Sequence, residues 1–555
     1  MQQSPYRALS ESFWFPCLLA FLLRTPSFFV NHYNVDEITN FIFSKFILDG
    51  RLSSQWLLGN TYYLTYGFYI VISRIFGSYN LVALHMAHAV WVSLTTFFIY
   101  WAGRELNQKN KGGFWAATFY AVFSVAFLSK DFHAALAESL SLLPAAMSLF
   151  CFLRAMRTKE KAAFVLAGFC VGLSALFKAP SGIMVLPMIL VALVIEGSWL
   201  VIISCIACGL ILALAFPFAF IEDPVAGFFM AIKNITNVKE GYIRAYDNIG
   251  FAYLFAKLAL RSFLLALAAF PLWFMAFGAV RKFFLKKAEI IYLVMTFLCL
   301  FVVTTLGKRV FFHYFVFLLP TLALLASVSM ISKLKEGVPN LLLKGFALYT
   351  FISVAGFSAD GLFQFSLKNE ISQKVIDEVI QTTKPSDRIY VWGLAPQIYF
   401  YSKREAASTQ IWADKLAGFS PGSPAMEYMR ATGKTLTLPD SIIQDLRLGD
   451  HQGELRQAPK ALAHSLNEKE LLTIAEILDS ISPENWKKLI SDFFVRPPVL
   501  FLDTSGANHR NFGTYPVSRY ELLQKFLYDN HYVRRKTVEG IDFYYLSPSA
   551  LDRKP

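Results

Sequence analysis

Charged residues are scarce in this chain of 555 residues. Asp, Glu, Lys and Arg together make up 16% of it and hydrophobic residues make up 55%, whereas soluble proteins usually carry about 25% charged residues. The scarcity is uneven, because charges are sparse before about residue 360 and ordinary after it. We therefore expect a membrane domain over residues 1–360 and a water-soluble domain over residues 361–555.

The soluble domain also lacks the residues for a disulfide framework and for a nucleotide-binding loop. All 6 cysteines lie in or beside apolar segments before residue 300, and neither G-x-G-x-x-G nor a P-loop sequence occurs in the tail. The C-x-x-C of Cys205 and Cys208 lies in an apolar stretch of small residues, which is typical of a helix in lipid. The net charge of +13 is carried by short basic clusters between apolar segments, so we expect no nucleic-acid partner.

Long apolar stretches dominate the first part of the chain. A membrane-spanning helix needs about 20 mostly apolar residues, and eleven stretches approach that length. They lie near residues 11–31, 79–102, 112–129, 138–154, 161–178, 180–196, 198–219, 251–279, 288–306, 310–331 and 340–359. The sequence therefore predicts a mostly α, polytopic membrane protein with about eleven transmembrane helices.

Lys and Arg cluster in alternate connecting segments, and this pattern predicts the orientation of the chain. The basic segments lie near residues 104–111, 154–161, 281–287 and 333–335. Because cytoplasmic loops carry the excess of positive charge, we expect a cytoplasmic N-terminus. An odd number of spans then places the C-terminal domain outside the cytoplasm. The predicted location is the inner (plasma) membrane, with the C-terminal domain in the periplasm.

Two regions between or after the predicted spans have patterns of their own. The first outer loop, residues 32–78, has apolar residues at helical spacing within 37–50, which is typical of a helix at the membrane interface. The tail combines strand-like segments with helix-like ones, and we expect a small extracytoplasmic mixed α/β domain there. The strand-like segments are 388–393, 498–503 and 543–546, and the helix-like ones are 370–382, 461–479, 484–494 and 518–529.

Acidic residues gather at the predicted outer ends of the spans. Asp36 and Glu37 follow the first span, where a carboxylate can accept a proton from a substrate hydroxyl. Acidic residues also suit the start of a helix, which is the alternative interpretation. Asp131, His133 and Glu138 lie around the third and fourth spans, and the two carboxylates share one face if the segment is helical. Solvation at the membrane edge is the alternative explanation for this second group.

Basic and aromatic residues lie on the same predicted side. Lys178 separates two apolar segments in LFKAPSG, and Lys308, Arg309, His313 and Tyr314 occur in LGKRVFFHY. Basic residues on an outer segment oppose the usual bias, and such cations can bind a phosphate group. Snorkelling of the lysine to the interface and pairing with an anionic lipid headgroup are the alternatives.

The order of these motifs resembles the GT-C class of membrane glycosyltransferases, in particular the bacterial protein O-mannosyltransferases and the lipid A aminoarabinose transferase. The sequence departs from that pattern at Ala179, where relatives often carry Gly, and at His85–Met86, where they often carry Arg-Leu. The resemblance covers most of the chain except about 415–490. Its segments are VDE (35–37), NTYYLTYGFYIVISRIFGSYN (60–80), KDFHAALAESL (130–140), LFKAPSG (176–182), HYFVFLLPTLALLA (313–326), DRIYVWGLAPQIYFYSKR (387–404) and RPPVLFLDTSG (496–506).

This resemblance implies a polyprenyl-phosphate-linked sugar donor and an acceptor hydroxyl on an envelope lipid, glycan or protein, as in lipopolysaccharide or protein glycosylation. Asp36 would be the general base, with Glu37 and Asp131 as further catalytic residues, and the anomeric carbon would be inverted. Cationic side chains would stabilise the departing phosphate. The implied substrate-binding residues are Tyr62, Tyr63, Glu138, Lys178, Lys308, Arg309, His313 and Tyr314.

The sequence demands no cofactor, although Asp36 and Asp131 could hold a divalent metal. Membrane lipids are expected partners, and the sequence leaves the oligomeric state open. Two other functions stay open as well. A multi-helix membrane transporter would favour inverted repeats and broken helices, and a non-catalytic envelope assembly protein could keep the same fold without turnover. Because the ionisable residues gather at the predicted outer edge, we expect a glycosyltransferase.

Overall fold

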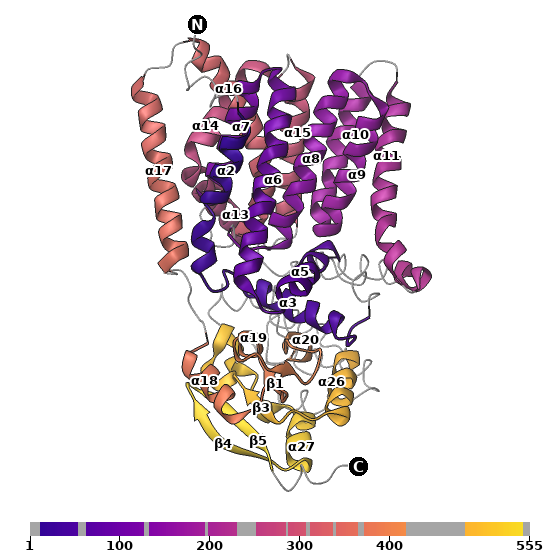
Figure 1. Cartoon of the computed structure of the whole chain (residues 1–555), viewed down its shortest axis with the longest axis vertical. Helices are drawn as coiled ribbons and strands as arrows, with labels where there is room; N and C mark the ends of the chain where they lie inside the picture. The colour runs from indigo at the N-terminus through magenta and orange to yellow at the C-terminus, as the bar shows by residue number, and fades with distance from the viewer. Residues whose placement is uncertain are drawn as a thin grey trace. The chain divides into compact units, whose positions relative to one another are not determined.

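The computed structural model describes residues 12–53, 63–126, 133–194, 198–221, 223–229, 251–284, 287–306, 311–336, 340–363, 371–417 and 483–547. It divides the chain into two compact units (Figure 1). The helical unit comprises residues 1–238 with 254–366, and the sheet unit comprises residues 239–253 with 367–555.

Helices account for nearly all of the described chain up to residue 363. They are α2 (Trp14–Leu22), η1 (Thr25–Phe29), α3 (Val35–Leu48), α5 (Tyr63–Phe76), α6 (Leu81–Asn107), α7 (Asn110–Ala126), α8 (Ala137–Thr158), α9 (Lys161–Phe177), η3 (Ala179–Met184), α10 (Val185–Val194), α11 (Trp199–Ala215), η4 (Phe216–Phe220), α13 (Phe251–Ala268), α14 (Phe270–Phe283), α15 (Ala288–Leu306), η5 (Phe312–Leu318), α16 (Leu319–Glu336) and α17 (Asn340–Phe363). This mostly helical architecture agrees with the predicted fold class.

Several of these helices can cross a membrane. Within the described residues, 5 are long and apolar enough by themselves: Leu81–Asn107, Ala137–Thr158, Trp199–Ala219, Ala288–Thr305 and Phe312–Lys333. Further apolar helices of 10–17 residues are too short to count alone. These helices support a multi-pass membrane protein, while the total of eleven spans and the orientation stay predictions.

One predicted span is wrong as a continuous helix. Instead of a single helix over 251–279, the chain forms Phe255–Ala268 and Phe270–Phe283, which are bent by 95° relative to each other. Pro271 lies in the first turn of α14, a position that proline favours because its ring already has the helical φ and lacks only an unneeded N–H. Apolar composition continues across the bend, so composition alone gives no sign of it.

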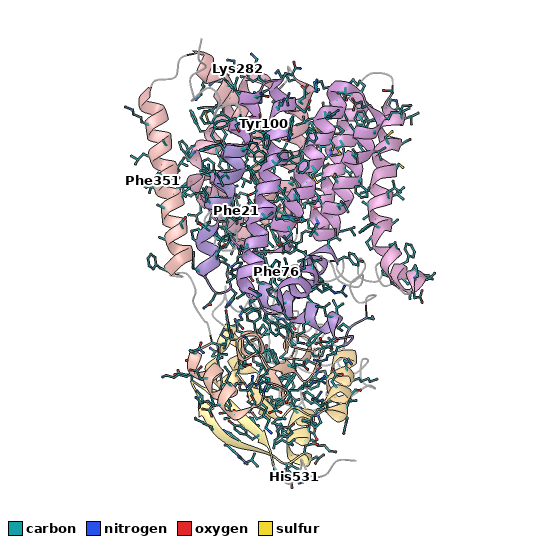
Figure 2. The ribbon with its side chains drawn as sticks, viewed as in Figure 1. Phe21, Phe76, Tyr100, Lys282, Phe351 and His531 are labelled. Carbon is teal, nitrogen blue, oxygen red and sulfur yellow. The ribbon has the colours of Figure 1, made fainter. Side chains whose placement is uncertain are left out.

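The outward faces of the helices are apolar. Phe351 on α17 is 70% exposed and Phe277 on α14 is 68% exposed, and Figure 2 shows Phe351 pointing away from its helix. A contiguous apolar surface of this kind is costly in water and is expected where lipid replaces water.

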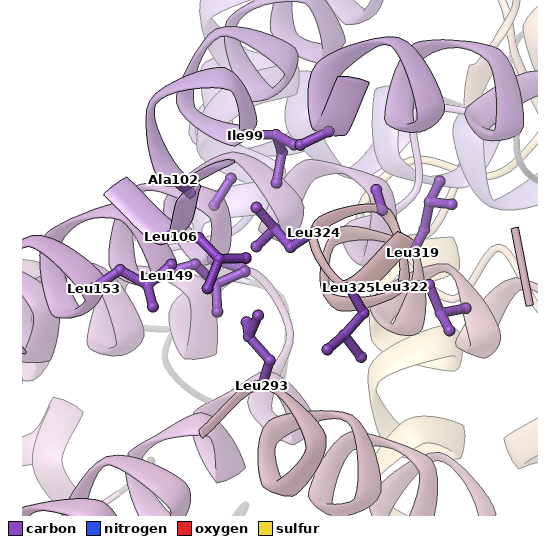
Figure 3. Packing of buried hydrophobic residues seen from close by; sticks show 14 of the residues in the cluster. Ile99, Ala102, Leu106, Leu149, Leu153, Leu293, Leu319, Leu322, Leu324 and Leu325 are labelled. Carbon is purple, nitrogen blue, oxygen red and sulfur yellow. The ribbon is translucent and has the colours of Figure 1, made fainter. Parts of the chain in front are cut away.

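Aliphatic side chains from four helices meet in one part of the core of the helical unit. Figure 3 shows Ile99 and Leu106 of α6 near Leu149 of α8, with Leu293 of α15 and Leu324 of α16 completing the cluster. All of these side chains are buried. The core therefore joins α6, α8, α15 and α16 side by side.

The pair α9 and α11 is packed backbone against backbone. A Cβ atom added to Gly209 would lie 1.9 Å from the carbonyl oxygen of Val165, and one added to Gly168 would lie 2.1 Å from that of Ile206. Only glycine fits at both positions, as in other close helix pairs in membranes.

Two helices occupy the predicted first outer loop. At the start of α3, the Asn34 side chain accepts a hydrogen bond from the Asp36 amide at 2.9 Å. The Glu37 side chain accepts one from the Asn34 amide, so the two residues form a capping box. The helical spacing seen in the sequence is thus confirmed by α3, whereas its location at the membrane interface stays a prediction. The other helix, α5, was not predicted, and its Tyr66 carbonyl accepts a hydrogen bond from Ser44 of α3.

The sheet unit contains a mixed sheet of five strands in the order β2-β1-β3-β5-β4. The strands β2, β1 and β3 are parallel, and β5 pairs antiparallel with both β3 and β4. Glu539 and Gly540, both at positive φ, turn β4 into β5. The strands are β1 (Arg388–Trp392), β2 (Glu405–Ala406), β3 (Leu500–Asp503), β4 (Tyr532–Val538) and β5 (Ile541–Leu546).

The predicted tail elements are mostly found. The strand predictions correspond to β1, β3 and β5, whereas β2 and β4 were missed. The helix predicted over 461–479 lies outside the described residues. The described helices are α18 (Gln373–Thr382), α19 (Gln397–Ser402), α20 (Asp414–Ala417), α26 (Pro483–Val495), η6 (Ser505–Ala507), η7 (His509–Thr514), η8 (Val517–Arg519) and α27 (Glu521–Asp529).

Candidate active site

Four of the predicted site residues lie together in the helical unit, although they come from three distant segments of the chain. We call Glu138, Lys178, His313 and Tyr314 the lysine cluster. Lys178 Nζ lies 2.7 Å from Glu138 Oε1, and His313 Nε2 lies 3.8 Å from the same oxygen. The ammonium also lies 5.2 Å from the centroid of the Tyr314 ring, within the range of a cation–π interaction.

The local sequence explains why Lys178 lies at this point. The helix α9 ends at Phe177, and Lys178 takes an extended conformation before the short helix η3 begins at Ala179, with Pro180 in its first turn. The Lys178 carbonyl accepts hydrogen bonds from the amide and the hydroxyl of Ser181. The break between two apolar helices therefore holds a charged side chain in a fixed backbone.

The ion pair of the lysine cluster is buried. Lys178 is 7% exposed and Glu138 is 4% exposed, so each charge depends on the other for compensation. An ammonium has three donors, and a single carboxylate oxygen serves both Lys178 and His313. Another anion could therefore take the place of the Glu138 carboxylate. The Lys178 ammonium, the His313 imidazole and the Tyr314 ring would remain in place to bind it.

The adjacent acids Asp36 and Glu37 have different surroundings. Asp36 is exposed, whereas Glu37 is fully buried. Glu37 Oε2 accepts from the amides of Tyr33 (2.8 Å) and Asn34 (3.4 Å), and Oε1 accepts from the amide of Ala135 (2.8 Å).

His85 completes the contacts of this carboxylate, because its Nε2 lies 3.3 Å from Glu37 Oε1. Burial by itself would raise the pKa of the Glu37 carboxyl, but His85 and the amides of Ala135 and Tyr33 hold that pKa below its ordinary value. We call Glu37, His85 and the amides that bind Glu37 the glutamate clamp.

The glutamate clamp and the lysine cluster share one segment of the chain. Ala135 donates its amide to Glu37 and accepts a hydrogen bond from the Tyr69 hydroxyl at 3.0 Å, and Glu138 follows three residues later. The Thr65 hydroxyl of α5 donates to the carbonyl of Phe177, directly before Lys178. The starts of α3, α5 and α8 and the end of α9 are therefore linked by hydrogen bonds.

Some predicted site residues cannot be compared with these clusters. Tyr62, Asp131, Lys308 and Arg309 lie outside the described residues, so their roles stay predictions. Tyr63 is half-buried at the start of α5, two residues before Thr65. Within the part of the chain that the structure describes, no group of three His, Cys, Asp or Glu side chains could hold a metal ion. The predicted Asp36–Asp131 metal pair stays a prediction.

The sequence analysis missed several buried polar residues next to the glutamate clamp. Arg24, His85 and His88 are each at most 4% exposed, and the Arg24 guanidinium donates to the carbonyl of Ser124. A usable signal existed, because ionisable residues inside apolar helices are rare and usually functional. Tyr33 packs against the rings of His85 and His133, which joins these residues to the segment that holds Glu138.

The comparisons with known proteins agree with this architecture. A family model described as dolichyl-phosphate-mannose-protein mannosyltransferase matches residues 65–221, a range that includes Glu138 and Lys178. No curated protein matches the chain in sequence. The fold is that of a GT-C membrane glycosyltransferase, and the predicted resemblance to the O-mannosyltransferase and aminoarabinose transferase group is confirmed.

Solved structures with a similar fold include ArnT from Cupriavidus metallidurans bound to undecaprenyl phosphate. It has 12% identity and a TM-score of 0.57, over 97% of this chain and 98% of that one. The apo form of ArnT has a TM-score of 0.56. The oligosaccharyltransferase from Archaeoglobus fulgidus, in complex with Zn and sulfate, has 13% identity and a TM-score of 0.50, over 96% of this chain and 73% of that one.

Proposed function

We propose that this protein is an inverting glycosyltransferase that moves a sugar from a polyprenyl-phosphate donor to an acceptor hydroxyl at the outer face of the membrane. The observation that carries the proposal is the lysine cluster, a buried ammonium held beside a carboxylate, an imidazole and a phenol ring. The undecaprenyl phosphate bound to ArnT, a protein of similar fold, supports a lipid phosphate as the ligand.

In the proposed reaction, Asp36 accepts the proton of the acceptor hydroxyl. The oxygen then attacks the anomeric carbon, and the bond from that carbon to the phosphate oxygen breaks with inversion. A phosphate leaving group needs its negative charge stabilised more than it needs a proton. Lys178 and His313 supply that charge, with Arg309 as a further cation. The exposed position of Asp36 at the start of α3 leaves its carboxylate accessible to an acceptor.

The substitution Asp36→Asn tests the base. We expect transfer from a polyprenyl-phosphate sugar to fall by about 10²–10⁴-fold, the usual contribution of a positioned base, while membrane insertion and thermal stability stay unchanged. Asp49→Asn is a matched control, because Asp49 follows the other end of α3 and pairs with Lys45 instead. Full activity of Asp36→Asn, measured with radiolabelled donor in nanodiscs, would remove Asp36 from the mechanism.

The identities of the sugar and the acceptor need a separate experiment. Mass spectrometry of envelope lipids, glycans and proteins, with and without the gene, would find a modification that depends on the protein. The purified protein should then produce it from the matching lipid-linked sugar. Treatment with EDTA followed by Mg²⁺ or Mn²⁺ would test the proposed Asp36–Asp131 metal pair.

A transporter remains a second candidate because one helix pair is broken. Transporters bind solutes at such breaks, and α13 and α14 are bent by 95°. However, Ala268 and Ala269 at this break carry no polar side chain. Solute counterflow in proteoliposomes, insensitive to Asp36→Asn, would favour transport over glycosyl transfer.

A further inference from the structure

The hydrogen bonds of His85 reveal how many protons its imidazole carries. Nδ1 lies 2.8 Å from the carbonyl oxygen of Ser27. A carbonyl oxygen can only accept a hydrogen bond, so Nδ1 must carry a proton. A neutral imidazole has a single proton, so in that state Nε2 would present a lone pair.

The group that faces Nε2 is the Glu37 carboxylate, 3.3 Å away. Amides of Ala135 and Tyr33 donate to its two oxygens, which favours the ionised carboxylate. A lone pair on Nε2 would then face a negative oxygen inside a buried site, an arrangement that costs free energy without any gain. Nε2 therefore carries the second proton, and the contact is an ion pair between an imidazolium and a carboxylate.

This pair joins four segments at one point. His85 lies in the second turn of α6 and contacts the Ser27 carbonyl at η1. Glu37 lies in the first turn of α3 and binds the amides of Tyr33 and Ala135. Since Asp36 directly precedes Glu37, any rotation of the start of α3 moves Asp36 as well.

We propose that His85 is a positioning residue: its imidazolium pairs with Glu37 and so holds Asp36 at a fixed place beside residues 133–138. The role assigned to Asp36 rests on the proposed function, but the charge of His85 does not. In this proposal Glu37 positions the adjacent Asp36 and does not itself act as a general base.

The other charged or titratable groups around His85 do not replace this pair. Tyr33 lies 5.4 Å from the His85 ring, and Arg24, His88 and His133 surround the same point. Arg24 is a further cation, so a loss of charge on Glu37 would leave positive groups facing one another. Tyr69 also interacts electrostatically with Glu37.

Two substitutions of His85 distinguish the effect of its positive charge from the effect of its hydrogen bonds. His85→Arg keeps a cation at every pH, and His85→Gln keeps a hydrogen-bonding side chain without a charge. Met86→Leu is the matched control, because Met86 is the next residue of α6 and is 47% exposed. All variants are made in the full chain in nanodiscs, and activity is expressed per folded protein.

Thermal unfolding at a single pH tests the charge without reference to activity. In His85→Gln the buried Glu37 carboxylate loses its counter-charge, whereas His85→Arg keeps a cation beside it. We expect the melting temperature of His85→Gln to fall by several degrees more than that of His85→Arg, and that of Met86→Leu to stay close to the wild type. Equal melting temperatures for His85→Gln and His85→Arg would overturn the proposed imidazolium.

Sugar transfer tests the positioning role. We expect His85→Gln to lower kcat by about 10–100-fold, the size of effect that small misplacements produce, with little change in the KM for the donor. His85→Arg should keep most of the wild-type activity, because it keeps the cation beside Glu37. A wild-type kcat in His85→Gln would overturn the role. If the wild-type protein transfers no sugar at all, the proposed function fails, whereas the unfolding experiment still decides the charge of His85.

Discussion

The glutamate clamp and the lysine cluster are both buried ion pairs within one helical unit, yet their carboxylates are bound differently. Backbone amides donate hydrogen bonds to both oxygens of Glu37. Unlike a side chain, a main-chain amide cannot swing away from its partner by a change of rotamer. Side chains alone provide the cations around Glu138, and both contact a single oxygen. The first arrangement is suited to holding a structure in place, and the second is suited to exchanging one anion for another.

This difference shows why burial of a charge alone does not identify a catalytic residue. Glu37 is more deeply buried than Glu138 and lies next to the candidate base. Besides His85, its contacts nevertheless go to main-chain amides, those of Tyr33, Asn34 and Ala135. The type of partner, amide or side chain, therefore carries more functional information than the degree of burial.

Among the residues of these two ion pairs, the largest effect is expected for Lys178→Met, which removes the cation of the lysine cluster. We expect kcat/KM for sugar transfer to fall by about 10²–10³-fold, as for other groups that stabilise developing charge. The substitution also leaves Glu138 buried without its cation, which can cost about 3–5 kcal/mol.

The double variant Lys178→Met/Glu138→Gln separates these two effects, because it removes both charges together. It should fold as well as the wild type and still lack activity. Transfer at near wild-type rates by the folded double variant would contradict the assignment of Lys178 to the departing phosphate.

An intermediate effect is expected from comparing Glu37→Gln with Glu138→Gln. In Glu37→Gln, the new side-chain nitrogen could not accept a hydrogen bond from a main-chain amide, so the free energy of unfolding should fall by about 3–5 kcal/mol. In Glu138→Gln, the buried Lys178 ammonium loses its counter-charge, but the remaining side-chain oxygen can still accept a hydrogen bond from it, so the loss should be smaller than in Glu37→Gln. Denaturant titrations in detergent would measure both. The opposite order of stabilities would contradict the contrast between the two carboxylates.

The smallest effect concerns His509, a buried histidine of the sheet unit that lies beside a cation instead of a carboxylate. Burial, together with Arg510, lowers the pKa of His509 from 6.5 to about 4. The unfolded chain therefore takes up the proton first, and this residue should destabilise the sheet unit as pH falls from 6.5 to about 4.

Hydrogen exchange of the β1 and β3 amides in the full chain would detect this effect. His509→Gln should weaken the pH dependence of their protection. His531→Asn is the control, because His531 is exposed in the same unit (Figure 2). An unchanged pH dependence in His509→Gln would show that burial of His509 does not destabilise the sheet unit at low pH.

Much of the lysine cluster could be predicted from the sequence. Charges of both signs at the ends of apolar segments, all on one predicted side, indicated a shared polar site, although solvation, snorkelling and headgroup pairing were alternatives. Glu138, Lys178, His313 and Tyr314 do meet. The glutamate clamp could not be predicted in the same way, because hydrogen bonds between amides and a carboxylate leave no pattern in side-chain types. The Asn34–Glu37 spacing of a capping box was the one available signal.

The missed elements of the fold have physical reasons of their own. The strand β2 has two residues, too few for any alternation, and β4 exposes Arg534, Arg535 and Lys536 at the edge of the sheet. Charges on an edge strand prevent pairing with other chains, but they also hide the apolar alternation that identifies strands. The bend before Pro271 was missed because both of its arms are equally apolar.

The close contact between α9 and α11 at Gly168 and Gly209 restricts sliding of α9 along its axis, and with it the position of Lys178. Sliding α9 along its neighbour would drive Gly168 and Gly209 out of their facing positions and bring main-chain atoms of Val165 and Ile206 against side chains. Since Lys178 directly follows α9, this interlock sets the depth of the ammonium relative to the rest of the bundle. A methyl group at Gly209 would therefore shift the ammonium that we propose binds the donor phosphate.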